Sequence, residues 1–284
     1  MTNEQPRLTI DKRSPALWAV TFANPPINLI DAAMVGELQQ LLTAAETDDR
    51  LAVIVLDSAD SEFFLAHWDI ADPALTNALP PGPTGMHPWL DVLVRLSRLP
   101  PVTIAALRGR ARGAGSEFAL ATDIRFASRE RAVLGRFELG AGAVPGGGPA
   151  IRLPRLVGRG RALEILMSAD DYDADLAERY GYVNRALPDA QFAGFVDRFA
   201  ERIARFDVRA IREMKAFVNA VSLPPANEFP PQMEAFFASA ARPATQDRSR
   251  QLLALGLQKP GEAERHLGRY LERIVTPEGY TGEA

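Results

Sequence analysis

A glycine-rich segment that carries a glutamate is the part of this sequence best suited to chemistry. It runs from Leu107 to Glu117. The apolar residues 102–106 before it predict a strand, and residues 118–121 after it predict a helix. Free N–H groups and the helix dipole at such a junction attract negative charge. The segment could therefore bind a developing oxyanion while Glu117 moves a proton beside it.

Two simpler interpretations of this segment stay open. Glycines at a strand–helix junction also serve close packing alone, and Glu117 could merely compensate the helix dipole. The spacing fits neither the dinucleotide-binding pattern nor the P-loop, because Gly-x-Gly-x-x-Gly and Gly-Lys-Ser/Thr are both missing here.

A second glutamate, Glu138, precedes a glycine-dense loop that ends at Gly148. Two carboxylates on separate loops can share one water, one as base and the other as acid, because their mutual repulsion separates their proton affinities. Composition alone favours a surface position for Glu138. A third segment, residues 63–70, follows the apolar run 51–56, which is typical of a buried parallel strand. Open α/β sheets place their sites where such strands end.

The elements that must position these residues alternate between strand and helix. Residues 8–12 and 17–22 predict a strand pair, Asp31 is expected to cap a helix, and residues 87–99 predict another helix. This alternation predicts an α/β sheet with crossover helices. Residues 71–85 are rich in proline and glycine, which predicts either a binding loop or a disordered insertion.

After Gly158 the sequence predicts mainly helices. An apolar stripe over residues 192–203 and another over residues 211–221 have helical spacing, and both are predicted to be ordinary core. Residues 242–257 predict a helical arm that docks on the rest of the molecule. Trp68 and Trp89 are expected to be hydrophobic wall.

Composition excludes several classes of function. The chain has 284 residues, 47% of them apolar, and a net charge of −4, which argues against nucleic-acid and anionic-membrane partners. Cysteine is absent, and the three histidines lack ligand spacing, so no metal site is predicted. The polar N-terminus is unlike a signal peptide, and no apolar run approaches the ~20 residues of a membrane span. We therefore expect a cytoplasmic protein.

Several segments, in order from Asn24 to about Asn184, resemble the crotonase (enoyl-CoA hydratase/isomerase) superfamily. Asn24–Ile30 is similar to its Asn-x-Pro…Asn-Ala-Leu segment, and Phe64–Ile70 to Phe-x-Ala-Gly-Ala-Asp-Ile/Leu. Pro101–Glu117 is similar to Lys-Pro-x-Ile-Ala-x-x-x-Gly-x-x-x-Gly-Gly-Gly-x-Glu. Phe137–Glu138 corresponds to the Pro-Glu pair that carries the second glutamate, and residues 144–148 correspond to the loop after it.

The resemblance implies a fold and an activity. The fold class would be α/β, a crotonase-like spiral of ββα units with a C-terminal helical trimerisation region. Residues 1–200 would form the core with the acyl-CoA site. Residues 201–284 would form the oligomerisation region, which in the family covers a neighbour's active site. The activity would be enoyl-CoA hydratase, adding water across the 2,3 double bond of a 2-enoyl-CoA. No separate cofactor is implied, because CoA is part of the substrate, and the assembly would be a homotrimer or hexamer.

The resemblance also assigns roles to individual residues. The N–H groups of Trp68 and Ala114 would form the oxyanion hole. Glu117 and Glu138 would be catalytic, with Glu138 closest to protonating carbon 2. The remaining substrate-binding positions would be Ala66, His67, Asp69, Ile70, Gly113 and Gly146.

The sequence departs from the family pattern at several of these positions. His67, Trp68 and Ala114 replace glycine, alanine and glycine, and Phe137 replaces proline. The basic residue that many members carry after the Asp-Ile pair is missing. His67 is either an extra acid or base, or a hydrogen-bonding substitute that tolerates unusual backbone angles. An isomerase, an acyl-CoA hydrolase and a non-catalytic scaffold stay open. The presence of both glutamates favours hydration.

Overall fold

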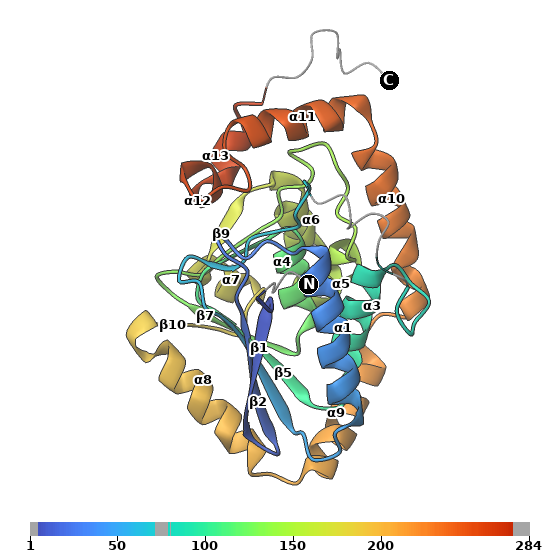
Figure 1. Cartoon of the computed structure of the whole chain (residues 1–284), viewed down its shortest axis with the longest axis vertical. Helices are drawn as coiled ribbons and strands as arrows, with labels where there is room; N and C mark the ends of the chain where they lie inside the picture. The colour runs from blue at the N-terminus through green and yellow to red at the C-terminus, as the bar shows by residue number, and fades with distance from the viewer. Residues whose placement is uncertain (1–4, 72–78, 80, 275–284) are drawn as a thin grey trace.

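The protein contains two β-sheets with helices around them (Figure 1). The structure is a computed structural model that describes residues 5–71, 79 and 81–274. The larger sheet has six strands in the order β1-β2-β3-β5-β7-β10, with β1 antiparallel to β2 and the other pairs parallel. Its strands are β1 (Leu8–Ser14), β2 (Leu17–Phe22), β3 (Val53–Ser58), β5 (Val102–Leu107), β7 (Ile124–Ser128) and β10 (Arg185–Leu187).

The smaller sheet takes one short strand from each successive unit of the chain. Its order is β4-β6-β8-β9, with β4, β6 and β8 parallel and β9 antiparallel to β8. These strands are β4 (Phe63–Leu65), β6 (Arg110–Arg112), β8 (Val133–Gly135) and β9 (Asp171–Asp173). The pairs β3–β4, β5–β6 and β7–β8 thus each send one strand to each sheet before the chain turns into helix. This repeated path confirms the expected spiral of ββα units.

Helices cover both faces of the larger sheet. The core helices are α1 (Ala32–Thr47), α3 (Pro88–Arg98), α4 (Ala114–Ala121), α5 (Pro149–Val157), α6 (Arg159–Ser168), α7 (Ala174–Tyr180) and α8 (Asp189–Ala204). Asp31 caps α1 as predicted, accepting a hydrogen bond from the Met34 N–H. On the opposite face, Phe192 and Val196 of α8 pack against Val55 and Phe126 of the sheet (Figure 1), so this predicted core stripe is confirmed.

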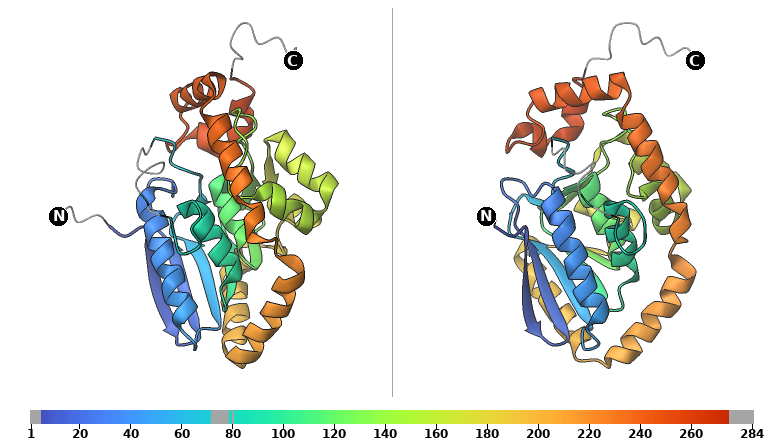
Figure 2. Two further views of the ribbon diagram at one scale, coloured as in Figure 1. Left: turned by 90° about the vertical axis from the view of Figure 1, so that its right-hand side faces the viewer. Right: turned by 45° about the vertical axis from the view of Figure 1, so that its right-hand side comes forward.

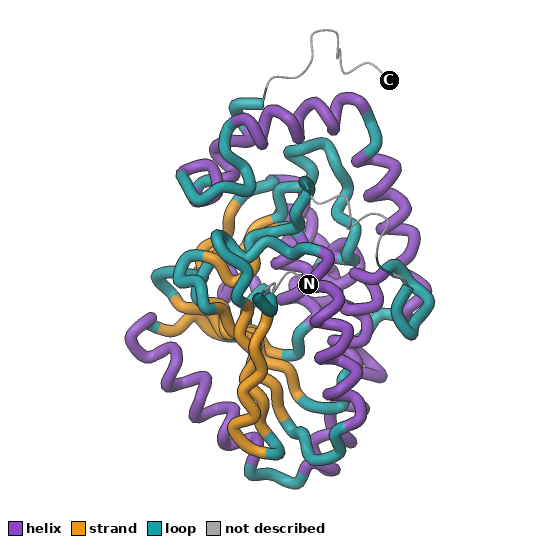
Figure 3. Tube along the Cα trace, in the orientation of Figure 1, coloured by secondary structure: helices purple, strands orange, loops and turns teal. Residues whose placement is uncertain are grey.

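The C-terminal helices form an arm that leaves the core and returns over one end of it (Figure 2). They are α9 (Val208–Ser222), the 3₁₀ helix η1 (Ala226–Glu228), α10 (Pro230–Ala240), α11 (Pro243–Ala254), α12 (Glu262–Arg265) and α13 (Leu267–Leu271). Figure 3 shows that this arm is almost entirely helix and loop. The division predicted at residue 200 falls within α8 and stays a prediction.

The core stripe predicted on α9 is wrong. Met214 is 64% exposed, Val218 is 53% exposed and Val221 is 89% exposed. The helical spacing of these residues is real, but α9 meets the rest of the molecule through the side that carries the buried Lys215, which leaves these three side chains exposed.

Residues 72–78 and 80 of the predicted loop lie outside the described residues. Of the helices that can be described, none is both long and apolar enough to cross a membrane.

Candidate active site

A cavity of about 500 Å³ collects nearly all the predicted site residues at one place. It is lined by the predicted residues His67, Trp68, Asp69, Ile70, Gly113, Ala114, Glu117, Glu138 and Gly146. Ala66 is the exception. It is buried with Ile27 and Phe63 in a separate apolar cluster and does not line this cavity. The segments after β4, β6 and β8 therefore meet at one end of the smaller sheet.

Two backbone N–H groups at the cavity are free to bind an anion. Ala114 is the first residue of α4, and Trp68 lies in an isolated bridge to Ile30. Neither N–H has an acceptor among the residues that the structure describes. Gly115 allows this arrangement, because a Cβ there would overlap the Leu65 carbonyl oxygen, so α4 approaches β4 more closely than any other residue permits.

Glu117 is buried, and three donors hold it at the floor of the cavity. Its Oε1 accepts hydrogen bonds from Arg136 Nη2 at 2.8 Å and from the Gly147 N–H at 2.8 Å. Its Oε2 accepts one from Trp89 Nε1 at 3.0 Å. Gly147 is required for this contact, since a Cβ on it would overlap the Glu117 carboxylate. The position predicted for Glu117, in the first turn of the helix after the glycine-rich segment, is confirmed.

Glu138 is buried as well, so the surface position that composition favoured for it is wrong. Its Oε1 accepts a hydrogen bond from the same Arg136 Nη2 at 2.6 Å. Its Oε2 is buried and has no partner among the described residues. One guanidinium nitrogen thus joins the two carboxylates.

Burial and charge act in opposite directions on this cluster. Burial raises the pKa of the Glu138 carboxyl, the positive charge of Arg136 lowers it, and the negative charge of Glu117 raises it. The net result is a pKa above the ordinary value. Burial alone would lower the pKa of Arg136, but the two carboxylates outweigh it and raise that pKa, so Arg136 is a permanent cation.

The cavity wall is aromatic, as expected for Trp68 and Trp89. Their rings pack edge to face with centroids 5.4 Å apart, and Trp89 also stacks on Phe118. Trp89 also has a role that was not predicted, because its indole N–H donates a hydrogen bond to Glu117.

The chain's own C-terminal helices close the other side of the cavity. Met233, Phe236 and Phe237 of α10 and Leu252 and Leu253 of α11 line it. The resemblance implied that these helices cover a neighbour's site. Here they cover the site of the chain to which they belong.

A buried polar link ties this cover to residues 66–70, the segment after β4 that carries the predicted oxyanion donor Trp68 and is called the oxyanion loop below. His67 Nδ1 donates a hydrogen bond to the Trp68 carbonyl at 2.9 Å, and Nε2 donates to Glu264 of α12 at 2.9 Å. Gln258 donates through its side chain to Asp69 at 2.8 Å. Both His67 nitrogens are thus occupied, which supports the hydrogen-bonding role. The backbone reason given for it fails, because His67 is not among the positive-φ residues of the described chain.

The charges on this link stabilise each other. Burial opposes ionisation of both partners, but the attraction and hydrogen bond between them outweigh it. The pKa of His67 is therefore raised above its ordinary value of 6.5, and the pKa of Glu264 is lowered below 4.5.

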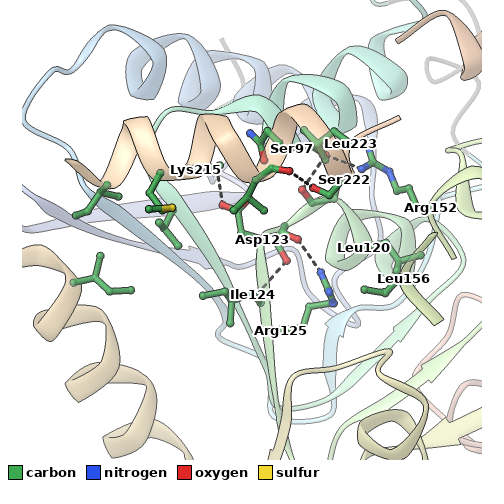
Figure 4. Close-up of a pocket in the computed structure, with 18 of the residues that line it drawn as sticks. Ser97, Leu120, Asp123, Ile124, Arg125, Arg152, Leu156, Lys215, Ser222 and Leu223 are labelled. Atoms are coloured by element: carbon green, nitrogen blue, oxygen red, sulfur yellow. Dashed lines mark hydrogen bonds and ion pairs between the residues drawn. The ribbon is translucent and has the colours of Figure 1, made fainter. Parts of the chain in front are cut away.

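A second cavity, of about 770 Å³, lies between α9 and the start of β7 (Figure 4). Lys215 and Asp123 form an ion pair at its wall, with Nζ and Oδ2 2.6 Å apart. None of the predicted site residues lines it, so its larger size does not make it the site. Across the described residues, no three His, Asp or Glu side chains are grouped to hold a metal ion.

Sequence reasoning missed Arg136, the Trp89 N–H, the Gly147 N–H and the cover by the same chain. Arg136 has a weak sequence signal, since it precedes Glu138 by two residues within an otherwise apolar and glycine-rich stretch. The cover by α10 and α11 has no sequence signal, because it depends on how the C-terminal helices pack back onto the core.

The sequence is similar to those of known proteins along most of the chain. A 203-residue stretch is 31% identical to the short-chain-enoyl-CoA hydratase of Clostridium acetobutylicum and 32% identical to the crotonyl-CoA hydratase of Syntrophomonas wolfei. Each match covers 71% of this chain and 77% of the relative.

Solved structures agree. A candidate enoyl-CoA hydratase from Streptomyces avermitilis is 41% identical with a TM-score of 0.90, over 97% of this chain and 99% of that one. An enoyl-CoA hydratase from Bacillus anthracis is 27% identical with a TM-score of 0.69, over 92% of this chain and 100% of that one.

The family model for enoyl-CoA hydratase/isomerase matches residues 12–242, which include both sheets except the start of β1, the two glutamates and α10. The ββα spiral, the free N–H groups at the start of α4 and this match lead to one conclusion: the chain belongs to the enoyl-CoA hydratase/isomerase family.

Proposed function

We propose that this protein is an enoyl-CoA hydratase that adds water across the 2,3 double bond of a 2-enoyl-CoA thioester. The observation that carries the proposal is the convergence of Glu117 and Glu138 on one guanidinium nitrogen, beside two free N–H groups in one cavity. The names of the Clostridium and Syntrophomonas relatives agree with it.

The backbone N–H groups would act on the thioester. Addition of water at carbon 3 moves negative charge onto the thioester oxygen, giving an enolate-like species. The N–H groups of Trp68 and Ala114 would donate hydrogen bonds to that oxygen. Each fixed donor of this kind lowers the barrier by about 3 kcal/mol. The CoA portion belongs to the substrate, and we expect no separate cofactor.

The two glutamates would divide the proton transfers. Glu117 is held by three donors that stabilise its negative charge, which suits a base that takes a proton from the attacking water. Glu138 has a raised pKa and a free Oε2, which suits an acid that delivers a proton to carbon 2. Water's hydroxyl ends on carbon 3, so one proton enters the pair and one leaves.

The direct test is hydration of crotonyl-CoA, followed by loss of the conjugated thioester absorbance and by chromatography of the product. Glu117→Gln and Glu138→Gln should each lower turnover by about 10²–10⁴-fold while CoA-ester binding persists. Glu213→Gln, at an exposed position of α9, is the matched control and should retain activity. A wild-type protein that only isomerises the double bond or releases free CoA would overturn the proposal, as would a fully active Glu117→Gln or Glu138→Gln variant.

The expected assembly is a homotrimer or hexamer. What supports self-association is the outward apolar side of α9, formed by Met214, Phe217, Val218 and Val221. Exposed apolar patches of this kind are typical of contact surfaces between proteins.

A further inference from the structure

Arg136 touches three parts of the candidate site at once. It directly follows β8 and is 1% exposed. Its Nη2 donates to Oε1 of both Glu117 and Glu138, and its Nη1 donates to the Gly113 carbonyl at 2.6 Å. It does not line the cavity, so it reaches the reacting atoms only through these partners.

The bond to Gly113 bears directly on the oxyanion donor. The Gly113 carbonyl and the Ala114 N–H belong to one trans peptide unit, so they point in opposite directions. A guanidinium held on the carbonyl side therefore aims the N–H toward the other side, where the cavity lies. A charged donor on the carbonyl also polarises the peptide, which strengthens the N–H as a donor.

The bonds to the glutamates bear on proton transfer. Two buried carboxylates without a cation between them repel each other, so one keeps its proton to high pH. The Arg136 cation offsets one of the two negative charges. The other ionisable groups facing the pair are His67 on the oxyanion loop, Tyr182 after α7 and Arg152 on α5. Arg136 is hydrogen-bonded to both carboxylates, whereas none of these three groups is.

We propose that Arg136 is the positioning residue of this site: one guanidinium fixes the spacing of the two glutamates, compensates their charge, and orients the Ala114 N–H. The inference rests on the proposed hydratase function and adds to it a coupling between the oxyanion hole and the acid–base pair. Neither half of the site can shift without moving the same side chain.

Two substitutions separate the charge of Arg136 from its geometry. Arg136→Met removes both. We expect kcat on crotonyl-CoA to fall by about 10²-fold with little change in KM, because misplaced groups slow the chemical step. The alkaline limb of the kcat profile should move to higher pH, since loss of the cation raises the pKa of Glu138, the proposed acid, still further.

Arg136→Lys keeps the charge but cannot bind both carboxylates and Gly113 in a planar fork. Its alkaline limb should stay near that of the wild type while its kcat remains low. The matched control is Arg125→Met. Arg125 is another buried arginine, and its guanidinium donates only to backbone carbonyls, so this change should lower stability without moving the pH profile.

A measurement without substrate keeps this inference separate from the proposed function. In Arg136→Met the folded-state pKa of Glu138 rises further above its unfolded value. The contribution of Glu138 to stability is then lost as pH rises, so the unfolding free energy should fall with increasing pH relative to the wild type. For Arg125→Met, the unfolding free energy should change with pH in the same way as that of the wild type. This slope tests the compensation of charge even if crotonyl-CoA is not hydrated.

The outcomes are decisive in both directions. A low kcat for both variants, with an alkaline shift only in Arg136→Met, supports the proposal. Wild-type kcat and pH profile in either variant overturns it. If Arg136→Met fails to fold, Arg136→Lys alone decides, because normal turnover with a lysine would show that the fork geometry is not needed.

Discussion

Trp89 illustrates how one side chain can serve both the wall and the chemistry of a site. Its ring packs on Trp68 and Phe118, while its N–H binds Glu117. Trp89→Phe keeps most of the packing and removes the donor. A hydrogen bond to a charged group is worth about 1.5–3 kcal/mol, so turnover should fall by about tenfold or more. The check is kcat on crotonyl-CoA beside Trp18→Phe, a buried tryptophan remote from the cavity. Equal activity of both variants would remove the N–H from the mechanism.

Ala114 is expected to act through its backbone alone. Ala114→Gly keeps the N–H and should change turnover little. Ala114→Pro removes the N–H and should lower turnover by about 10²–10³-fold. Because this N–H makes no hydrogen bond in the described structure and proline suits the first position of a helix, the fold should survive. Circular-dichroism melts of both variants separate lost chemistry from lost structure. A folded proline variant with ordinary turnover would contradict the assignment.

The docking of α12 on the oxyanion loop should depend on pH through His67 and Glu264. The raised pKa of His67 gives stability that is complete below its ordinary pKa of 6.5 and is lost as pH rises through the folded-state value. The lowered pKa of Glu264 gives stability that is complete above 4.5 and is lost as pH falls. The pair should therefore stabilise the cover most between these two values.

Glu264→Gln tests this dependence by unfolding in denaturant at several pH values. Removing one partner of a buried ion pair costs about 3–5 kcal/mol, so the variant should have a lower free energy of unfolding than the wild type between pH 4.5 and 6.5. The fall in the wild type's unfolding free energy at higher pH should be missing from the variant. Glu262→Gln, on the same helix but with an exposed carboxylate, serves as control. An unchanged pH dependence in Glu264→Gln would show that the pair does not anchor the arm.

For the molecule as a whole, the exposed apolar residues of α9 allow a test of self-association. Phe217 and Val221 are 72% and 89% exposed, and burying them between copies would release water from a large apolar area. The wild type should sediment as a trimer or larger at micromolar concentration. Phe217→Arg with Val221→Arg should give smaller, folded species, whereas Glu213→Gln on the same helix should not. A monomeric wild type would contradict the expectation.

Sequence reasoning succeeded where the pattern was local. The Asp31 cap, the strand pair and the glycine-rich turn before Glu117 each depend on neighbours in the chain, and each is present. It failed where the packing of segments that are distant in the sequence determines which way a side chain faces and what it contacts. The spacing of Met214, Val218 and Val221 defines an apolar side of a helix but not the direction it faces. Likewise, Arg136 is an ordinary charged residue until the fold brings Glu117 and Gly113 to either end of its guanidinium.

The link between His67 and Glu264 has a consequence for synthesis of the protein. A ribosome adds about 5–20 residues per second, so Glu264 emerges on the order of ten seconds or more after His67. Until then the oxyanion loop lacks the partner that holds it, and α10 and α11, which also line the cavity, are themselves made only shortly before Glu264. A nascent chain with both sheets formed would therefore carry both glutamates in a site still open to water, and it would gain its enclosed cavity only after α12 has been synthesised.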